Sequence, residues 1–249
     1  MSEGCVVCTS YFSKKVHPQF GDPQLEGVQT DGRAKQNDIS YIGRWYESVK
    51  SLNLNARIFC DNLTPEFIAQ HETKKIKFVN VETSDYSYND WRFFCYREFF
   101  EINRFDRIFM TDASDVIVAS DPSYLFDLMP EVDYFVGKDS IKLCQFPYLH
   151  GHQQFGFDNY IAFFLKQFEW DLINMGAIGA RYDDMMTFLN IICQLRIQMG
   201  NPQFNADIWT GNYIFRHLLS DKKIHIGAPL TSNFKQYEYQ RKDVCFIHK

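Results

Sequence analysis

Hydrophobic positions in the first half of the chain follow two alternating spacings. Short apolar runs, such as "CVVCTSYF" at residues 5–12, are typical of buried strands. Between these runs, apolar residues recur every three or four positions, as Ile39, Ile42 and Trp45 do, which is typical of helices. The pattern therefore predicts strands and helices in alternation. The predicted strands are residues 5–12, 56–62, 75–82 and a run that stops at Asp112, and the predicted helices are residues 38–52, 64–71 and 89–103.

The second half of the chain is less regular but continues the same pattern. Strand–helix alternation predicts an α/β fold, in which one mainly parallel sheet is covered by helices on both faces. We expect a single domain over residues 1–249. In such sheets, ligands bind outside the carboxyl ends of the strands. The further predicted strands are residues 132–138, 170–180, 223–227 and the tail 244–249, and the further predicted helices are residues 183–200 and 205–219.

Two carboxylates interrupt the apolar pattern where a predicted strand ends. Asp112 and Asp115 lie between the apolar runs 108–110 and 116–118, and an unpaired charge is costly to bury. Two acids at this spacing can hold Mg²⁺ or Mn²⁺, and such a cation can bridge a diphosphate. A solvated turn is the structural alternative. Asp61 ends another predicted strand, so it is expected at the same edge of the sheet.

Composition and charge argue against several classes of function. A net charge of −5 provides no general electrostatic reason to bind nucleic acid or an anionic membrane. Among the seven cysteines, Cys5 and Cys8 have C-x-x-C spacing, but they lie inside an apolar run and are interpreted as core residues, with a redox or metal role as the alternative. The cysteines as a whole are typical of free thiols in a reducing compartment. The first residues do not have the pattern of a signal peptide, and no window reaches the ~18 apolar residues of a membrane span. A cytoplasmic protein without a membrane span is therefore expected.

Four motifs follow one another in an order that resembles glycosyltransferases of the GT-A fold, such as the glycogenin-like and related families. They are "DRIFMTDASDVIVASDPSYLF", "WDLINMGAIGA", "NADIWTGNYIF" and the terminal "FIHK". Those families carry an "lDaDvlf"-type metal motif, an "fNaGvi" strand end, a "DQ..lN" helix start and a late metal-binding His. This chain departs from the family pattern at the metal motif, because Ala113 and Ser114 both separate the two acids.

The resemblance implies a metal-dependent transferase. It would move a sugar from a nucleotide-diphosphate sugar, with a UDP-sugar favoured, to a hydroxyl of a glycan, protein or small-molecule acceptor. Retention of the anomeric configuration is the preferred outcome. The fold implied is a Rossmann-like GT-A domain, with a nucleotide-binding half at about residues 1–121 and a sugar- and acceptor-binding half at about residues 122–249.

By the same resemblance, Asp115 and His248 are direct ligands of Mn²⁺ or Mg²⁺. Asp112 then belongs to the metal site through a metal-bound water, or faces the ribose, and Ser114 is an alternative first ligand. A His next to the end of a chain is usually a surface residue. The apolar "CFI" that precedes His248 indicates instead that the tail folds back into the domain. Neutral imidazole is an acceptable Mn²⁺ ligand alongside oxygen ligands.

Three further residues are expected to line the sugar pocket. Asn174 would hydrogen-bond sugar hydroxyls, and Gly176 would leave room for the ring, whereas close backbone packing is the structural alternative. Asp207 opens a predicted helix, where an acid also compensates the helix dipole. The resemblance places it near the reacting sugar as a positioning group or general base. The Gln that follows this acid in the family is Ile208 here.

The nucleotide is expected at the end of the first strand. Thr9, Ser10 and Tyr11 would hold the base and ribose, with the ring of Tyr11 stacked on the base, and Asp61 would be a second contact. On the helix before the acids, the resemblance implies that Arg92 reaches the diphosphate or holds the acid motif in place. Arg97 is expected on a solvated helix face.

The aromatic-rich segment with His150, His152, Phe155 and Phe157 is interpreted as a lid or an acceptor-binding loop. Two other classes of function stay open. A nucleotidyltransferase would normally show a Gly-rich basic loop after the first strand, and "TSYFSKKVHPQFGDP" is a poor fit to that pattern. A non-catalytic sugar- or partner-binding domain is favoured only by the lengthened spacing of the two acids.

Overall fold

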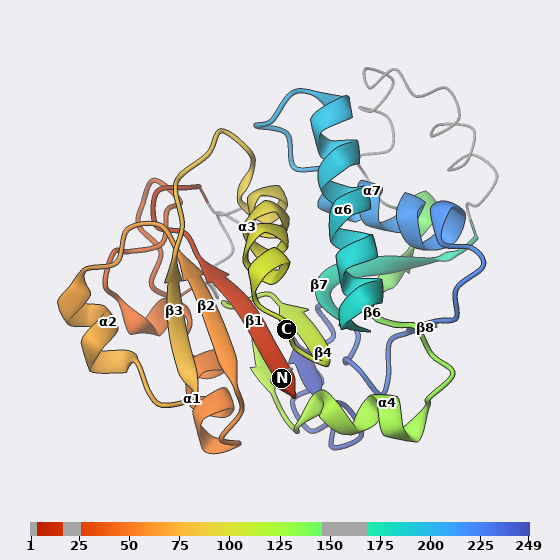
Figure 1. Cartoon of the computed structure of the whole chain (residues 1–249), viewed down its shortest axis with the longest axis horizontal. Coiled ribbons are helices and arrows are strands. Elements are labelled where there is room, and N and C mark those ends of the chain that lie inside the picture. The colour runs from red at the N-terminus through yellow and green to blue at the C-terminus, as the bar shows by residue number, and fades with distance from the viewer. Residues whose placement is uncertain (1–3, 17–25, 146–168) are drawn as a thin grey trace.

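A seven-stranded sheet forms the centre of the computed structural model, which describes residues 4–16, 26–145 and 169–249. The strand order is β3-β2-β1-β4-β7-β6-β8, and only β7 runs antiparallel to its two neighbours (Figure 1). The expected α/β fold with a mainly parallel sheet is therefore confirmed. The strands are β1 (Cys5–Tyr11), β2 (Ala56–Cys60), β3 (Ile76–Asn80), β4 (Arg107–Thr111), β6 (Tyr134–Lys142), β7 (Asp171–Arg181) and β8 (Ile224–Ile226).

The direction of β7 corrects one expectation from the sequence. The predicted strand 170–180 is β7, Asp171–Arg181, and Asn174 lies inside it and not at its end as in the family motif. Because β7 is antiparallel to β4, its early residues lie beside the carboxyl end of β4, where Thr111 pairs with Ala177. The N–H of Asp112 donates to the Gly176 carbonyl at 2.9 Å. Asn174 and Gly176 thus reach the expected edge of the sheet near the start of their strand.

The helices begin and end at residues that the sequence marks. Thr64 accepts a hydrogen bond from the Phe67 N–H at 3.3 Å, as expected of an N-cap, and Pro65 follows at the first helical position. Gly200, with φ of +63°, ends the longest described helix, since glycine tolerates this conformation. The helices are α1 (Gly43–Ser51), α2 (Pro65–His71), α3 (Tyr88–Ile102), α4 (Leu125–Leu128), α6 (Tyr182–Met199) and α7 (Asp207–Tyr213).

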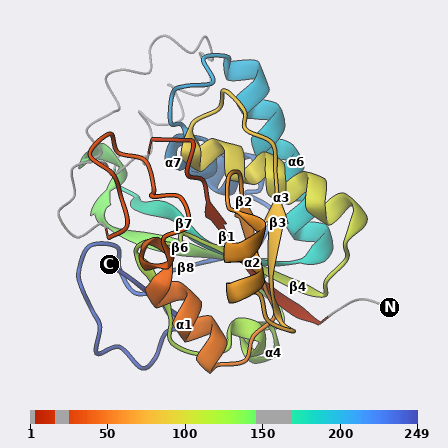
Figure 2. The ribbon, with the colours of Figure 1, turned by 90° about the vertical axis from the view of Figure 1, so that its left-hand side faces the viewer.

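Helices cover the sheet from both sides (Figure 2). On one face, the buried indole of Trp45 in α1 donates from Nε1 to Oγ1 of Thr111 at 2.8 Å. On the other face, α3 and α6 pack against each other through the edge-to-face rings of Phe93 and Phe188. Burial of these apolar faces supplies the main stabilisation, at ~25 cal/mol per Å² of apolar surface.

A second, two-stranded sheet brings the end of the chain into the fold. β5 (Val116–Val118) pairs antiparallel with β9 (Phe246–His248), with Val116 opposite His248. The backbone N–H of Lys249 donates to the Asp115 carbonyl at 2.8 Å. The tail is therefore folded back as the apolar residues before His248 indicated.

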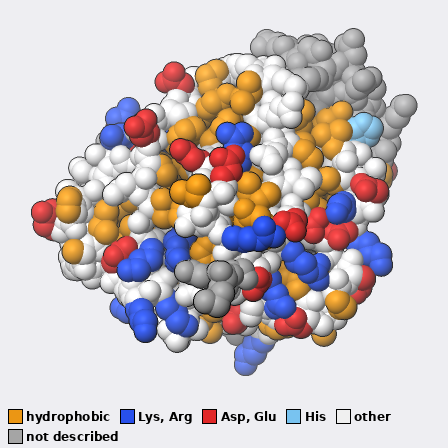
Figure 3. All heavy atoms as spheres, viewed as in Figure 1, with side chains coloured by type: hydrophobic (Ala, Val, Ile, Leu, Met, Phe, Trp, Pro, Cys, Tyr) orange, Lys and Arg blue, Asp and Glu red, His pale blue; other side chains and the backbone are white. Residues whose placement is uncertain are grey.

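The surface and the thiols are consistent with the composition. Acidic and basic side chains are interspersed on the face shown in Figure 3. All seven cysteines are free thiols, as expected. Across the described parts of the chain, no helix combines the length and apolar character needed to cross a membrane.

Candidate metal and sugar site

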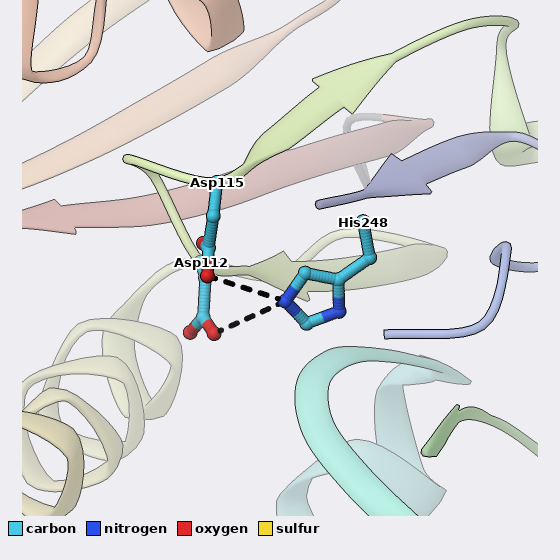
Figure 4. A group of neighbouring side chains, drawn as sticks. All are labelled: Asp112, Asp115 and His248. Carbon is cyan, nitrogen blue, oxygen red and sulfur yellow. Dashed lines mark ion pairs between the residues drawn. The ribbon is translucent and has the colours of Figure 1, made fainter. Parts of the chain in front are cut away.

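Three side chains from separate elements converge at the carboxyl edge of the sheet. Asp112 follows β4, Asp115 immediately precedes β5, and His248 belongs to β9. The β5–β9 pairing decides this meeting, because it sets His248 beside the residue that follows Asp115. Figure 4 shows the His248 ring pointing at both carboxylates.

The geometry of this group fits a divalent cation. Nε2 of His248 lies 3.5 Å from Oδ2 of Asp115 and 3.8 Å from Oδ2 of Asp112. One potential ligand atom from each residue lies within 4.8 Å of the others. His248 is only 1% exposed; among the described residues its Nδ1 meets no hydrogen-bond partner, and its Nε2 faces the two carboxylates without a well-formed hydrogen bond. A buried imidazole is seldom left this way, so a cation at this point would satisfy it.

The electrostatics around His248 also favour a cation at this point. Burial lowers the pKa of His248, but the Asp115 and Asp112 carboxylates outweigh burial and raise it overall. Two acids that hold a proton on the imidazole are equally able to hold a cation in its place. The backbone fixes the ring, because the His248 N–H donates to Oγ of Ser232 at 2.8 Å.

Gly176 forms the floor of the group, and no side chain fits there. A Cβ on Gly176 would lie 2.2 Å from Cε1 of His248, 2.6 Å from Oδ2 of Asp112 and 2.9 Å from Oδ1 of Asn174. The Asn174 amide shapes this turn of backbone, since its Oδ1 accepts from the Gly176 N–H at 2.7 Å. Its Nδ2 donates to Oδ2 of Asp139 at 3.4 Å. Asn174 and Gly176 therefore lie beside the acids, and their expected contact with a sugar stays a prediction.

Arg92 joins the acid motif to the start of α7. Its Nη1 pairs with Oδ1 of Asp112, and its Nη2 lies 3.3 Å from Oδ2 of Asp207. Nη2 also donates to the Met175 carbonyl at 3.2 Å. The guanidinium is almost fully buried, so these charge-assisted contacts strongly fix the position of the Arg92 side chain. Of its two expected roles, the ion pair with Asp112 agrees with that of holding the acid motif in place, and contact with a diphosphate stays a prediction.

Asp207 titrates in an unusual environment. Burial, with a smaller contribution from the nearby carboxylates of Asp90 and Asp112, raises its pKa to about 7 against the opposing effect of Arg92. Its Oδ1 accepts from the Ile208 N–H at 2.8 Å. A carboxyl group that titrates near neutrality can position a hydroxyl either as acceptor or as donor.

A buried ion pair that the sequence did not reveal supports Asp207. Nε of Arg196 in α6 lies 3.1 Å from Oδ2 of Asp90 in α3, and both side chains are 0% exposed. The same carboxylate oxygen accepts from the N–H of Ala206, the residue before Asp207, at 3.2 Å. Nη2 of Arg196 donates to the Phe204 carbonyl at 3.0 Å. The pair therefore fixes the segment that leads into α7. Its only sequence signal is a charged residue among the apolar positions of each helix.

Comparison with known proteins adds the fold family. No protein-family model and no curated protein matches the sequence. A structure of the galactosyltransferase LgtC in complex with donor and acceptor sugar analogs is similar, with a TM-score of 0.57 and 12% identity. An active-site mutant of LgtC is similar with a TM-score of 0.55 and 12% identity. Each match covers 98% of this chain and 86% of the LgtC chain. The chain has the GT-A glycosyltransferase fold.

In this GT-A fold, the side chains expected to bind the nucleotide face inward. Thr9 lies inside β1, is fully buried and donates from Oγ1 to the Thr111 carbonyl at 3.0 Å. Ser10 is also buried, and its carbonyl accepts from the hydroxyl of Tyr88 at 2.8 Å. The side chains of Thr9 and Ser10 thus pack inside the fold, because β1 is central and covered on both faces, and their contact with a nucleotide stays a prediction.

The ring of Tyr11, which was expected to stack on the base, also faces inward in this structure. Its ring is fully buried and lies 5.1 Å from the Tyr41 ring, so neither face is offered to a base. Its hydroxyl lies within hydrogen-bond distance of the Lys35 and Asp38 carbonyls, which share its one hydrogen, and it accepts from the Asp38 N–H at 3.0 Å. These hydrogen bonds connect the end of β1 to the segment before α1.

Two other expectations concern the surroundings of the site. The Asp61 carboxylate accepts from the N–H groups of Ser13 at 2.8 Å and Lys14 at 3.2 Å, so it shapes the segment after β1. Nε of Arg97 lies 3.7 Å from Glu101 one turn later, on the helix surface as expected. The aromatic segment with His150, His152, Phe155 and Phe157 lies outside the described residues.

Proposed function

We propose that this protein is a metal-dependent glycosyltransferase that uses a nucleotide-diphosphate sugar, with a UDP-sugar favoured. One observation carries the proposal. Asp112, Asp115 and His248 converge at the carboxyl edge of the sheet in a GT-A fold, where such sheets bind their ligands. The acceptor would be a hydroxyl of a glycan, protein or small molecule.

In this proposal, Asp115, His248 and Asp112 hold Mn²⁺ or Mg²⁺. The cation would neutralise the diphosphate and stabilise the charge that develops as it leaves. Arg92 keeps Asp112 oriented through its ion pair, and the same guanidinium reaches Asp207. The nucleotide-binding half at about residues 1–121 thereby contacts the sugar-binding half at about residues 122–249.

The sugar would lie against Asn174, Gly176 and Asp207. Gly176 keeps the floor of the site open, since any side chain there would enter the acid–histidine group. Asp207 is paired with Arg92 at 3.3 Å. The pairing engages one carboxylate oxygen of Asp207, so we propose that Asp207 positions a hydroxyl or acts as general base through the other. Retention of the anomeric configuration is part of the proposal through the resemblance alone.

Calorimetric titration with UDP, GDP, CDP and dTDP tests this function, each with Mn²⁺ and again with EDTA. We expect one nucleotide to bind with Mn²⁺ and to lose its binding with EDTA or in Asp115→Asn. Asp183→Asn is the matched control, because this carboxylate is 84% exposed and pairs only with a surface arginine among the described residues. Absence of metal-dependent binding for all four nucleotides would refute the proposal.

A further inference from the structure

A cavity of about 520 Å³ opens beside the candidate site, and we call it the basic pocket. It lies between the segment after β1, the β3–α3 connection and the α6–α7 connection. The last two connections meet where the Ser87 N–H donates to the Pro202 carbonyl at 2.7 Å. Figure 1 shows both connections together at the top of the molecule.

Positive charge dominates the described lining of the basic pocket. Lys14, Lys15 and Arg33 face it, whereas Asp85 is the one acid among the described lining residues. The chain as a whole carries a net charge of −5, so the positive charge around this pocket is opposite in sign to the charge of the whole protein. Arg33 has a distant and exposed partner, since its Nε lies 3.8 Å from Oδ2 of Asp31.

The ammonium group of Lys15 pairs with no carboxylate in the described part of the chain. Its Nζ donates to the backbone carbonyls of Ser84 and Tyr86 instead. By contrast, Nζ of Lys222 lies 2.8 Å from Oδ1 of Asp184. Partial burial lowers the pKa of Lys15 and outweighs the nearby carboxylates. An anion placed beside a partly desolvated cation that contacts only carbonyl dipoles would stabilise it through a charge-assisted hydrogen bond.

The amino end of α3 and two amide side chains complete the wall. Ser87, the N-cap of this 15-residue helix, and Tyr88, its first residue, both line the pocket. The aligned peptide dipoles place partial positive charge at this end of a helix. Gln203 and Asn205 add neutral donors from the α6–α7 connection. Point charges, a helix end and amide donors together are the chemistry that recognises phosphate or carboxylate.

The basic pocket adjoins the candidate site without sharing its metal ligands. Asn205 precedes Asp207 by two residues, so the pocket and the expected sugar contact lie on one connection. Asp112, Asp115 and His248 are not among its described lining residues. A diphosphate held at the metal would therefore not be the group that occupies this pocket.

We propose that the basic pocket binds an anionic group, a phosphate or a carboxylate, carried by the acceptor. The assignment to the acceptor rests on the proposed glycosyltransferase function, because only a transferase would bind a sugar acceptor next to Asp207. Anion binding itself follows from Lys14, Lys15 and the α3 end, whatever reaction the protein catalyses.

Calorimetry with inorganic phosphate in EDTA tests anion binding, because EDTA removes the metal route. We expect saturable binding that weakens by about tenfold or more in Lys14→Gln/Lys15→Gln, since two charge-assisted contacts are lost. Lys74→Gln is the matched control, being an exposed lysine just before β3 at the opposite edge of the sheet. Lys14→Gln alone changes an exposed side chain and keeps the test valid if the double variant is unstable.

Binding of glucose 6-phosphate is measured next, with glucose as the uncharged control. This comparison distinguishes a pocket for an anionic acceptor from a pocket for a free anion. Tighter binding of the sugar phosphate than of inorganic phosphate, with the same dependence on both lysines, supports the proposal. Equal binding of the two overturns its acceptor part. No phosphate binding in EDTA, or binding indifferent to Lys14 and Lys15, overturns it entirely. If phosphate binds but UDP with Mn²⁺ does not, the proposed function fails while the anion pocket stands.

Discussion

Replacement of Gly176 by alanine should destroy metal binding and leave the fold largely intact. Ordinary van der Waals contact begins near 3.4 Å, whereas the new Cβ would lie 2.2 Å from Cε1 of His248 and 2.6 Å from Oδ2 of Asp112. Relief of these contacts requires one or both ligands to move by roughly 1 Å, several times the ~0.2 Å tolerance of a metal–ligand distance.

The two effects of Gly176→Ala are measurable separately. Overpacking of a filled site typically costs about 1–3 kcal/mol of unfolding free energy, which urea denaturation reports. Loss of ligand geometry should weaken Mn²⁺ binding by about 100-fold or more, which calorimetry or electron paramagnetic resonance of Mn²⁺ reports. Metal affinity should therefore fall much further than stability.

Gly43→Ala is the matched control for this substitution. No atom lies within 4 Å of a Cβ built on Gly43, which is the first residue of α1. This variant should bind Mn²⁺ and UDP as the wild type does, and its stability should be unchanged or slightly increased. Wild-type Mn²⁺ affinity in Gly176→Ala would refute the proposed ligand set, because the alanine methyl group cannot coexist with Asp112 and His248 as placed.

Three further outcomes are expected. Because the pKa of Asp207 is raised from 3.8 to about 7 in the folded state, the folded protein binds one more proton than the unfolded protein between these pH values. The unfolding free energy should therefore fall as pH rises through this window. Urea denaturation of Asp207→Asn should lack this pH dependence. Arg196→Met leaves the Asp90 carboxylate buried and unpaired, and should cost about 3–5 kcal/mol by urea denaturation; a loss below 1 kcal/mol would contradict the buried pair. Trp45→Phe removes the donor to Thr111 and should lower the unfolding free energy by about 1–3 kcal/mol without changing Mn²⁺ affinity, and a change in metal affinity would show that α1 contributes to the site.

Several parts of the fold and site were predictable because their signals are local. Thr64 and Pro65 mark the start of α2, and Gly200 marks the end of α6, through conformational preferences of single residues. Asp112 stands out because a carboxylate ends an apolar strand. His248 stands out because the residues before it are apolar although the chain is about to end.

Other expectations depend on the direction of a side chain, which the residue type does not reveal. A Tyr at the end of a strand is equally suited to stack on a base or to fill a core. Tyr11 fills the core because Tyr41 packs against it and its hydroxyl lies within hydrogen-bond distance of the Lys35 and Asp38 carbonyls. Similarly, the strand 170–180 was predicted, but no local pattern shows that β7 runs antiparallel, which is what brings its early residues beside the end of β4.

The sequence by itself determined the alternation of strands and helices, the edge of the sheet at which the site lies, and the acids that belong there. These features depend on the spacing of apolar and polar residues within one segment. Only the tertiary structure decided that β9 pairs with β5, that Arg92 joins Asp112 to Asp207, and that Asp90 pairs with Arg196. Those contacts join residues far apart in the chain, and long-range packing of the whole domain selects them.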